Sequence, residues 1–166
     1  MTAAVRLFET GPLRFLPSPL REPRRAWLAI LIAAALTLSG SLLLSWIADS
    51  LAPQLGKPEF PLKGPVALVM LVLFAPLTET LIMAAVLSLL ARFVPATVAV
   101  LASAVLWGIA HSLQAPVWGL VIWWPFLIFS TLYMVWRQRG VWAGISVAAS
   151  THALQNLGPA LLIAFP

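Results

Sequence analysis

Long apolar runs without charged residues divide most of the chain into segments that can cross a bilayer. The first covers residues 26–48 and the second residues 65–91. No Asp, Glu, Lys or Arg occurs within residues 93–136, and at 1.5 Å per residue this helical run is about 66 Å long, enough for two crossings. A break is predicted at residues 112–116, where a glutamine and a proline interrupt the run. Because a spanning helix needs about 20 apolar residues, residues 140–163 predict a fifth span.

Composition supports the membrane interpretation. Of the 166 residues, 61% are apolar and only 9% are charged, whereas a soluble domain is about half apolar and one quarter charged. A chain of this size has too little interior to hide so much apolar surface from water. These values exclude a soluble domain and a disordered chain, and the absence of cysteine excludes a disulfide scaffold and a cysteine nucleophile. The sequence therefore predicts an all-α polytopic membrane protein with about five transmembrane helices, forming one domain over residues 26–166.

The positions of the basic residues predict how the spans are oriented. Lys57 and Lys63 lie in the first loop, between spans one and two. The other eight basic residues precede span one or lie between spans two and three or spans four and five: Arg6, Arg14, Arg21, Arg24, Arg25, Arg92, Arg137 and Arg139. Because loops rich in Lys and Arg stay in the cytoplasm, the N-terminus is predicted to be cytoplasmic. The basic residues form no single patch, so nucleic acid is not an expected partner.

Residues 1–25 form a separate N-terminal segment, predicted to be cytoplasmic or at the membrane interface. Apolar residues and arginines are mixed over residues 5–20, and three prolines there exclude a long helix. Two interpretations remain open, a segment lying on the inner membrane surface and a flexible tail. The apolar run that follows is too long for a cleavable signal peptide, which favours an uncleaved signal anchor.

Four polar residues inside the predicted spans are the candidates for function. Counted from the cytoplasmic end of each span, Glu79 lies about 18 Å deep, His152 about 16 Å, Asn156 about 22 Å and His111 about 25 Å. Each of them alone is compatible with a hydrogen bond between helices. An intramembrane carboxylate is costly, however, and marks function more often than structure. The similar depths of residues from three helices favour one shared site.

This combination of side chains is suited to proton transfer. A desolvated Glu79 beside imidazoles can take a proton from water that attacks a carbonyl, while a neutral histidine and an asparagine amide donate hydrogen bonds to the oxyanion. Glu79, His111 and His152 are also a plausible set of metal ligands, although the compact H-E-x-x-H motif is absent. Serine hydrolysis is disfavoured, because the chain has no G-x-S-x-G motif and no Asp within a span.

Three short motifs resemble, in order and spacing, those of the CPBP membrane family, which includes the type II CAAX prenyl proteases and bacteriocin-processing and self-immunity proteins. The matching stretches are Pro76-Leu-Thr-Glu79-Thr80, Trp107-Gly-Ile-Ala-His111 and His152-Ala-Leu-Gln-Asn156. The resemblance covers about residues 70–160. It implies that Glu79 activates water together with His111, and that His152 and Asn156 act as oxyanion or metal-site residues.

The chain also departs from the family pattern. Thr80 stands where the family has a second Glu, and Ala84 stands where it has an Arg. Trp107 replaces the family's Phe and, with Thr80, is predicted to support the site. In the family, this Glu and Arg are able to form an ion pair. Replacing both by neutral residues therefore leaves the net charge of this region unchanged. The short chain is more similar to small bacterial members that act on C-terminal sorting tails.

The leading hypothesis is a glutamate-dependent intramembrane endopeptidase of a bacterial inner membrane. Its partner is a membrane-anchored protein, cut near the anchor, where an unwound segment reaches a wet cavity between helices. No cofactor is expected in this version, and the metal-dependent version with zinc stays as an alternative. A second alternative, favoured by the missing Glu and Arg, is a non-enzymatic binding or immunity protein that holds a hydrophobic peptide in the same fold.

Overall fold

The protein folds into helices and connecting loops. The structure, a computed structural model, describes residues 7–166; this part of the chain is 79% helical in a count that finds no strands. Three short elements are η1 (Pro12–Phe15), α1 (Ser18–Arg21) and η3 (Arg137–Arg139). The longer elements are α2 (Ala26–Leu51), α3 (Gly64–Val69), η2 (Met70–Phe74), α4 (Ala75–Leu90), α5 (Ala96–Ser112), α6 (Pro116–Trp136) and α7 (Val141–Ala164). The prediction of an all-α protein is confirmed.

Each predicted span corresponds to one helix. For the second span this helix consists of α3, η2 and α4, which run on without a break from Gly64 to Leu90. Within residues 7–166, three helices are long and apolar enough to cross a membrane: Ala26–Leu51, Gly64–Leu90 and Pro116–Arg139. The apolar helix α5 has 17 residues, and α7 has 24 residues but includes several polar ones. The predicted break also matches, since α5 ends at Ser112 and α6 begins at Pro116. The chain is a polytopic membrane protein.

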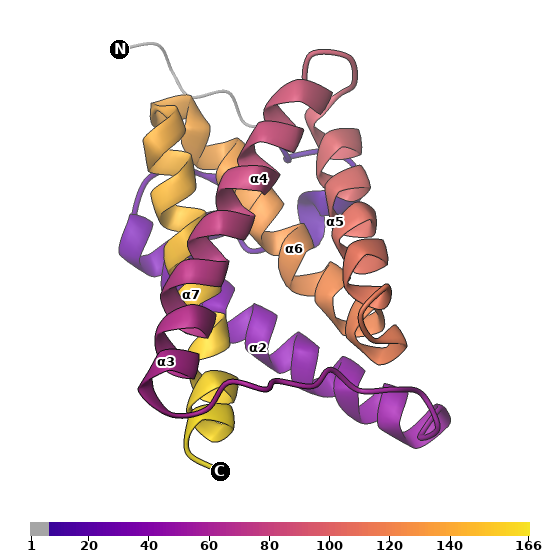
Figure 1. The fold of residues 1–166 in the computed structure, drawn as a ribbon. Coiled ribbons are helices and arrows are strands. Elements are labelled where there is room, and N and C mark those ends of the chain that lie inside the picture. The colour runs from indigo at the N-terminus through magenta and orange to yellow at the C-terminus, as the bar shows by residue number, and fades with distance from the viewer. Residues whose placement is uncertain (1–6) are drawn as a thin grey trace.

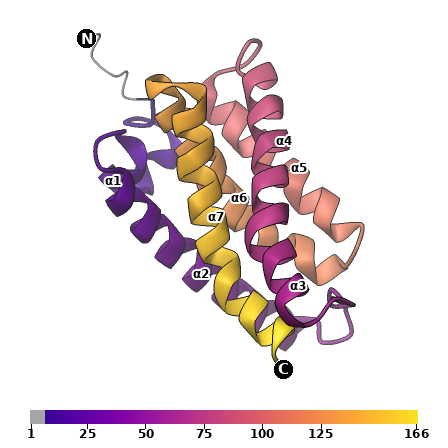
Figure 2. The ribbon, with the colours of Figure 1, turned by 60° about the vertical axis from the view of Figure 1, so that its left-hand side comes forward.

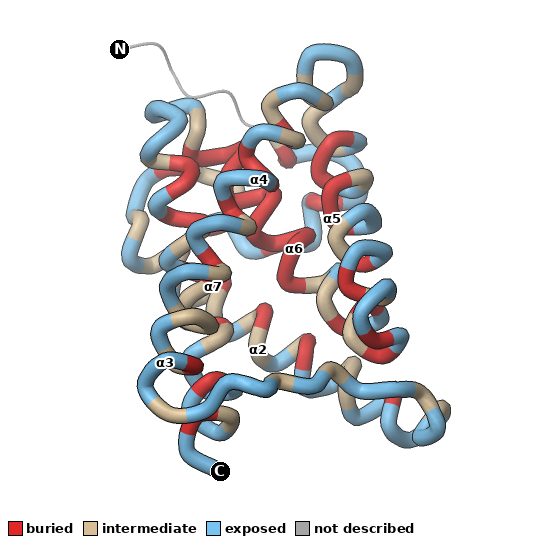
Figure 3. Tube along the Cα trace, viewed as in Figure 1, coloured by how far each residue is buried: buried red, intermediate tan, exposed pale blue. Residues whose placement is uncertain are grey.

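Helix α6 lies at the centre of the bundle and contacts α5, α7 and α2 (Figures 1 and 2). All residues from Pro125 to Trp136 are buried, as the red stretch of α6 in Figure 3 indicates. A helix that is apolar on every side is typical of such a central position. On α6, a Cβ added to Gly119 would collide with the carbonyl oxygen of Gly108 and the Ser112 hydroxyl, so α5 and α6 pack backbone to backbone. This contact fixes the end of α5 that carries His111.

The N-terminal segment packs against the helices over its described residues, while residues 1–6 lie outside them. The side chains of Phe8, Leu13, Leu16 and Leu20 are buried in the hydrophobic core. Arg21 donates a hydrogen bond from Nε to the Leu16 carbonyl at 2.8 Å. Because α1 contacts both α2 and α6, this packing favours a docked segment over a flexible tail.

The two ends of the bundle carry different connections. The α4–α5 turn and η3 lie together at one end (Figures 1 and 2). The loop over residues 52–63, the α5–α6 turn and the C-terminus lie at the other. Within this loop, Phe60 makes an edge-to-face contact with Trp118 at 5.6 Å between ring centroids, so the loop is held against the start of α6.

Candidate active site

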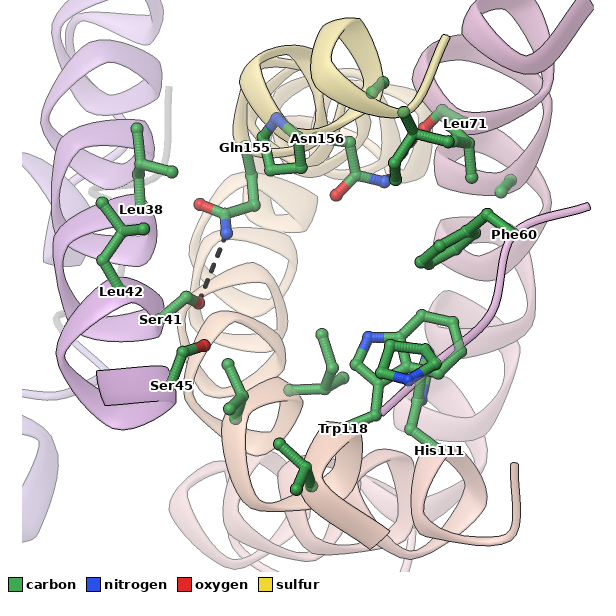
Figure 4. A pocket seen from close by; sticks show the side chains of 18 of the residues that line it. Leu38, Ser41, Leu42, Ser45, Phe60, Leu71, His111, Trp118, Gln155 and Asn156 are labelled. Carbon is green, nitrogen blue, oxygen red and sulfur yellow. Dashed lines mark hydrogen bonds between the residues drawn. The ribbon is translucent and has the colours of Figure 1, made fainter. Parts of the chain in front are cut away.

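One cavity of about 400 Å³ brings together all four polar residues predicted from the sequence. Glu79, His111, His152 and Asn156 all line it, although they come from α4, α5 and α7. Figure 4 shows the side chains of His111 and Asn156 on different sides of the space. The structure therefore groups the residues that the depth estimate indicated as one site.

Glu79 and His152 lie next to each other in the cavity. The Oε2 atom of Glu79 lies 3.8 Å from Nε2 of His152. This distance exceeds that of a direct hydrogen bond, which is about 2.7–3.2 Å. The side chain of Glu79 is 27% exposed and that of His152 is 6% exposed, so the carboxylate reaches the open space while the imidazole is enclosed. The carboxylate is thus placed to meet a small molecule in the cavity.

The ring of His111 is fixed by the main chain of its own helix. Its Nδ1 lies 2.9 Å from the carbonyl oxygen of Trp107, one turn earlier. A carbonyl oxygen can only accept, so Nδ1 carries the hydrogen and Nε2 keeps its lone pair when the ring is neutral. The ring also packs edge-on against Trp118, with 4.7 Å between centroids. His111 therefore offers an acceptor nitrogen in a defined orientation.

Aromatic rings hold His152 and connect it to the surroundings of His111. The imidazole of His152 stacks on Phe129 at 4.5 Å and meets the edge of Phe126 at 5.4 Å. Phe126 lies 5.7 Å from the His111 ring and stacks on Trp107 at 4.3 Å. The Nδ1 atom of His152 is buried without a hydrogen-bond partner, so Nε2 is the nitrogen that faces Glu79.

A local change in helix geometry explains the position of Asn156. The segment η2 is a π-helix in which Ala75 donates its N–H to Met70, five residues earlier. The Leu71 carbonyl would accept from Ala75 in an α-helix and from Pro76 in a π-helix. The N–H of Ala75 is already bonded to Met70, and Pro76 has no N–H, so the Leu71 carbonyl has no donor within its own helix. The side chain of Asn156 supplies the missing donor, since its Nδ2 donates to the Leu71 carbonyl oxygen at 2.9 Å. The amide of Asn156 is thereby anchored, and its second N–H stays available.

Sequence reasoning missed a group of polar residues on the side of the cavity opposite His111 (Figure 4). Gln155 is buried and donates from Nε2 to the Ser41 hydroxyl at 3.3 Å (Figure 4). Ser45 and Asp49 also line the cavity. The serines and the aspartate recur every four residues on α2, a spacing that puts them on one helix face. This regular spacing was the sequence signal that could have identified the polar side of α2.

The two residues predicted to support the site do not line the cavity. Thr80 is buried with its hydroxyl unpaired and points elsewhere than Glu79. Ala84, one turn later, is also buried, so small side chains occupy the face where the family has charged residues. Trp107 contacts the site indirectly, through its carbonyl bond to His111 and its stacking on Phe126.

The three side chains predicted as possible metal ligands, Glu79, His111 and His152, all line the cavity. Among residues 7–166, no group of three or more His, Asp or Glu side chains lies close enough together to hold a metal ion. Of the side chains predicted as metal ligands, Glu79 and His152 lie 3.8 Å apart.

Comparisons with known proteins agree with the motifs. Residues 61–158, more than half of the chain, match the family described as Rce1-like, type II CAAX prenyl endopeptidase Rce1-like. This range includes all four residues that the sequence predicts as catalytic. No curated protein and no solved structure matches the chain. The family match is independent of the cavity geometry, and on it the chain belongs to the Rce1-like family of type II CAAX prenyl endopeptidases, a family of membrane proteases.

Proposed function

We propose that the protein is an intramembrane endopeptidase that uses Glu79 as a general base and cuts a membrane-anchored protein near its anchor, in a bacterial inner membrane. The observation that carries the proposal is the convergence of Glu79, His111, His152 and Asn156 on one cavity. Family membership supports peptide hydrolysis as the reaction. The 400 Å³ volume holds a short extended segment of a polypeptide.

The first step is attack of water on the scissile carbonyl. A water molecule between Glu79 and His111 gives one proton to the carboxylate as its oxygen bonds to the carbonyl carbon. The lone pair on Nε2 of His111 accepts the second hydrogen of this water and orients it. This assignment uses the Nδ1 bond to Trp107, which leaves Nε2 as the acceptor. Glu79 is exposed enough to receive the water, since its side chain keeps 27% exposure.

The negative charge that develops on the carbonyl oxygen needs hydrogen-bond donors. Nε2–H of His152 and the second N–H of Asn156 supply them in the proposed mechanism. Asn156 is preorganised by its bond to Leu71. The intermediate then collapses: the carbon–nitrogen bond breaks, and the departing amine takes the proton from Glu79. The second hydrogen of the water stays on the new carboxyl group, so a carboxylic acid and a free amine are formed and Glu79 is again a carboxylate.

Two alternatives receive less support. The non-enzymatic binding protein is favoured by Thr80 and Ala84, which replace charged family residues, but these two side chains lie outside the cavity. Their replacement therefore leaves the proposed catalytic groups in place. The metal-dependent protease lacks a cluster of three ligands in the part of the chain that the structure describes.

The direct test is cleavage of a co-expressed, membrane-anchored reporter protein. Replacing the base by an amide, Glu79→Gln, is expected to lower the rate by about 10²- to 10⁴-fold, the usual contribution of a general base. Glu59→Gln makes the same chemical change in the loop, outside the cavity lining, and is the matched control. Undiminished cleavage by Glu79→Gln would refute the mechanism.

Two further measurements address the alternatives. A binding protein should tolerate His111→Ala without loss of phenotype, whereas the protease should lose cleavage. Chelators and metal analysis of the purified, active protein address the metal: activity that survives chelation without stoichiometric zinc supports the metal-free version, and loss of activity that zinc restores supports the other.

A further inference from the structure

The cavity is confined to one end of the bundle. Most of its lining residues come from four segments: the C-terminal half of α2, the loop over residues 52–63, the start of α6 and the C-terminal half of α7. The remaining ones lie at or near Leu71, Glu79 and His111. No lining residue falls within residues 80–110 or 127–151. These two ranges contain the α4–α5 turn and the α6–α7 connection, which lie at the opposite end (Figures 1 and 2). The cavity therefore opens toward the end that carries the 52–63 loop.

An ion pair marks the mouth of the cavity. Nζ of Lys57 lies 2.9 Å from Oδ1 of Asp49, and both residues line the cavity. Their side chains are 60% and 46% exposed. Because exposed charges are costly in hydrocarbon, this pair indicates that the mouth lies at the aqueous boundary of the membrane. The Glu79 carboxylate thus shares one continuous space with a water-exposed ion pair.

A polar stripe on α2 connects this mouth with the interior. Ser41, Ser45 and Asp49 lie one turn apart on the cavity side of the helix, and Figure 4 shows the two serines facing the space. At its deep end the stripe reaches Gln155 through the Ser41 hydrogen bond. Hydrolysis consumes one water per bond, and this line of hydroxyl groups provides a hydrated route from the mouth.

The charge distribution identifies the side on which this mouth lies. The end away from the mouth carries Arg92 in the α4–α5 turn and Arg137 and Arg139 in η3. The basic N-terminal segment belongs to the same side by chain order, since one crossing, α2, separates it from the loop. The end with the mouth has Lys57 and Lys63, offset by Asp49 and Glu59. By the positive-inside rule, the arginine-rich end is cytoplasmic.

We infer that the cavity opens to the non-cytoplasmic side of the membrane, and that the substrate is an exported, membrane-anchored protein whose scissile segment lies on that outer side. The substrate class rests on the proposed function, whereas the direction of the opening does not. Water and the unwound substrate segment enter between α2, the 52–63 loop and the start of α6. A protein tail that lies only in the cytoplasm does not reach Glu79.

The absence of cysteine from the chain makes the opening directly measurable. Single-cysteine variants of the full chain are labelled in intact cells with a membrane-impermeant maleimide, and again after permeabilisation. Lys57→Cys reports on the mouth and Gln138→Cys, in η3, on the opposite end. Both positions are exposed, and neither has been assigned a role in catalysis. We expect Lys57→Cys to be labelled in intact cells and Gln138→Cys only after permeabilisation.

A second pair of variants tests the hydrated route. Ser45→Cys lies on the cavity side of α2, whereas Ser39→Cys is exposed on the same helix and does not line the cavity. Labelling of Ser45→Cys from outside, with Ser39→Cys unreactive in the lipid, supports the route. The reverse labelling pattern of Lys57→Cys and Gln138→Cys would overturn the inferred opening, as would equal protection of Ser45→Cys and Ser39→Cys.

The substrate class is tested with two reporters that share one anchor and place the same cleavage segment outside or inside the membrane. We expect cleavage of the outer segment and loss of that cleavage in Glu79→Gln. Cleavage of the inner segment alone would overturn the inference. Outside labelling with neither reporter cut would refute the proposed function and the substrate class together, and would still support the opening, because labelling does not depend on proteolysis.

Discussion

The end of the bundle with the α4–α5 and α6–α7 connections is closely packed, whereas the opposite end encloses the cavity. At the packed end, polar side chains pair with each other: Ser88 bonds to Tyr133 at 2.7 Å, and Ser130 donates to Ser103 at 3.0 Å. At the cavity end, Nδ1 of His152 and Oε1 of Gln155 are buried without partners. Two more buried atoms lack partners, Oγ1 of Thr80 and Nε1 of Trp136, but neither residue lines the cavity. What distinguishes the cavity end is that its unpaired atoms belong to residues that border an open space, where a ligand or water can reach them.

This difference suggests that the two ends of a single helix have different roles, one in packing and one in lining the cavity. Helix α6 is buried continuously from Pro125 onward, and its earlier turns line the cavity through Val117, Val121 and Ile122. The packed end holds the helices in place, and this rigidity keeps the proposed catalytic groups at the cavity end in a fixed geometry. Changes at the cavity end should alter cleavage with little effect on folding, and changes at the packed end should do the opposite.

After Glu79→Gln, the largest effect on cleavage is expected from removing an oxyanion donor. Asn156→Ala should lower kcat by about 10²- to 10³-fold, as loss of one such donor does in other enzymes. Thr151→Val on the same helix is the control, because the Thr151 hydroxyl bonds only within its helix, to the Val147 carbonyl. Cleavage rates of both variants on one reporter decide the matter. Equal rates for Asn156→Ala and Thr151→Val would remove Asn156 from the mechanism.

The contact between α5 and α6 is where the two ends depend on each other. Gly119→Ala forces a Cβ against Gly108 and Ser112, and such overpacking should cost about 1–3 kcal/mol in the free energy of unfolding. Cleavage should fall as well, since His111 lies at the end of α5. Gly158→Ala meets no neighbouring atom within 4 Å and should change stability by less than about 1 kcal/mol. Unfolding in detergent micelles measures both, and similar values for the two variants would contradict the close packing.

A polar pair at the packed end should affect stability alone. Tyr133→Phe removes the hydroxyl that bonds to Ser88 and should lower the free energy of unfolding by about 0.5–1.5 kcal/mol. The cleavage rate should stay unchanged, because neither residue lines the cavity. Ser88→Ala should have a similar cost, and the double variant should cost less than the sum. A strong loss of cleavage in Tyr133→Phe would break the proposed division.

The smallest effect is expected at the position where the chain differs from its family's aromatic residue. Trp107→Phe keeps the main-chain carbonyl that fixes His111 and loses only part of the ring stacked on Phe126. Stability should fall by less than about 1 kcal/mol, and cleavage should change little. A loss of cleavage as large as that of Asn156→Ala would show that the indole itself takes part in the reaction.

The sequence was informative about position along the chain and less so about direction around a helix. Spans and their breaks followed from uncharged runs, and Glu79, His111, His152 and Asn156 stood out because polar groups are rare in such runs. The role of Gln155 was invisible, since only the packing of α7 against α2 brings it to Ser41. The availability of the Leu71 carbonyl as an acceptor for Asn156 was equally hidden, because it depends on a change of helix type before Pro76.

That change of helix type also limits the insertions and deletions that this part of the chain can accept. The π-helix places one extra residue in the turn over Met70–Phe74. Deleting one residue between Leu71 and Pro76 would return this turn to α-helical geometry and put the proline four residues after Leu71. At that spacing a proline ring clashes with the carbonyl, which is the acceptor of Asn156. Apolar replacements along this turn should be accepted freely, whereas a change in the number of its residues should not.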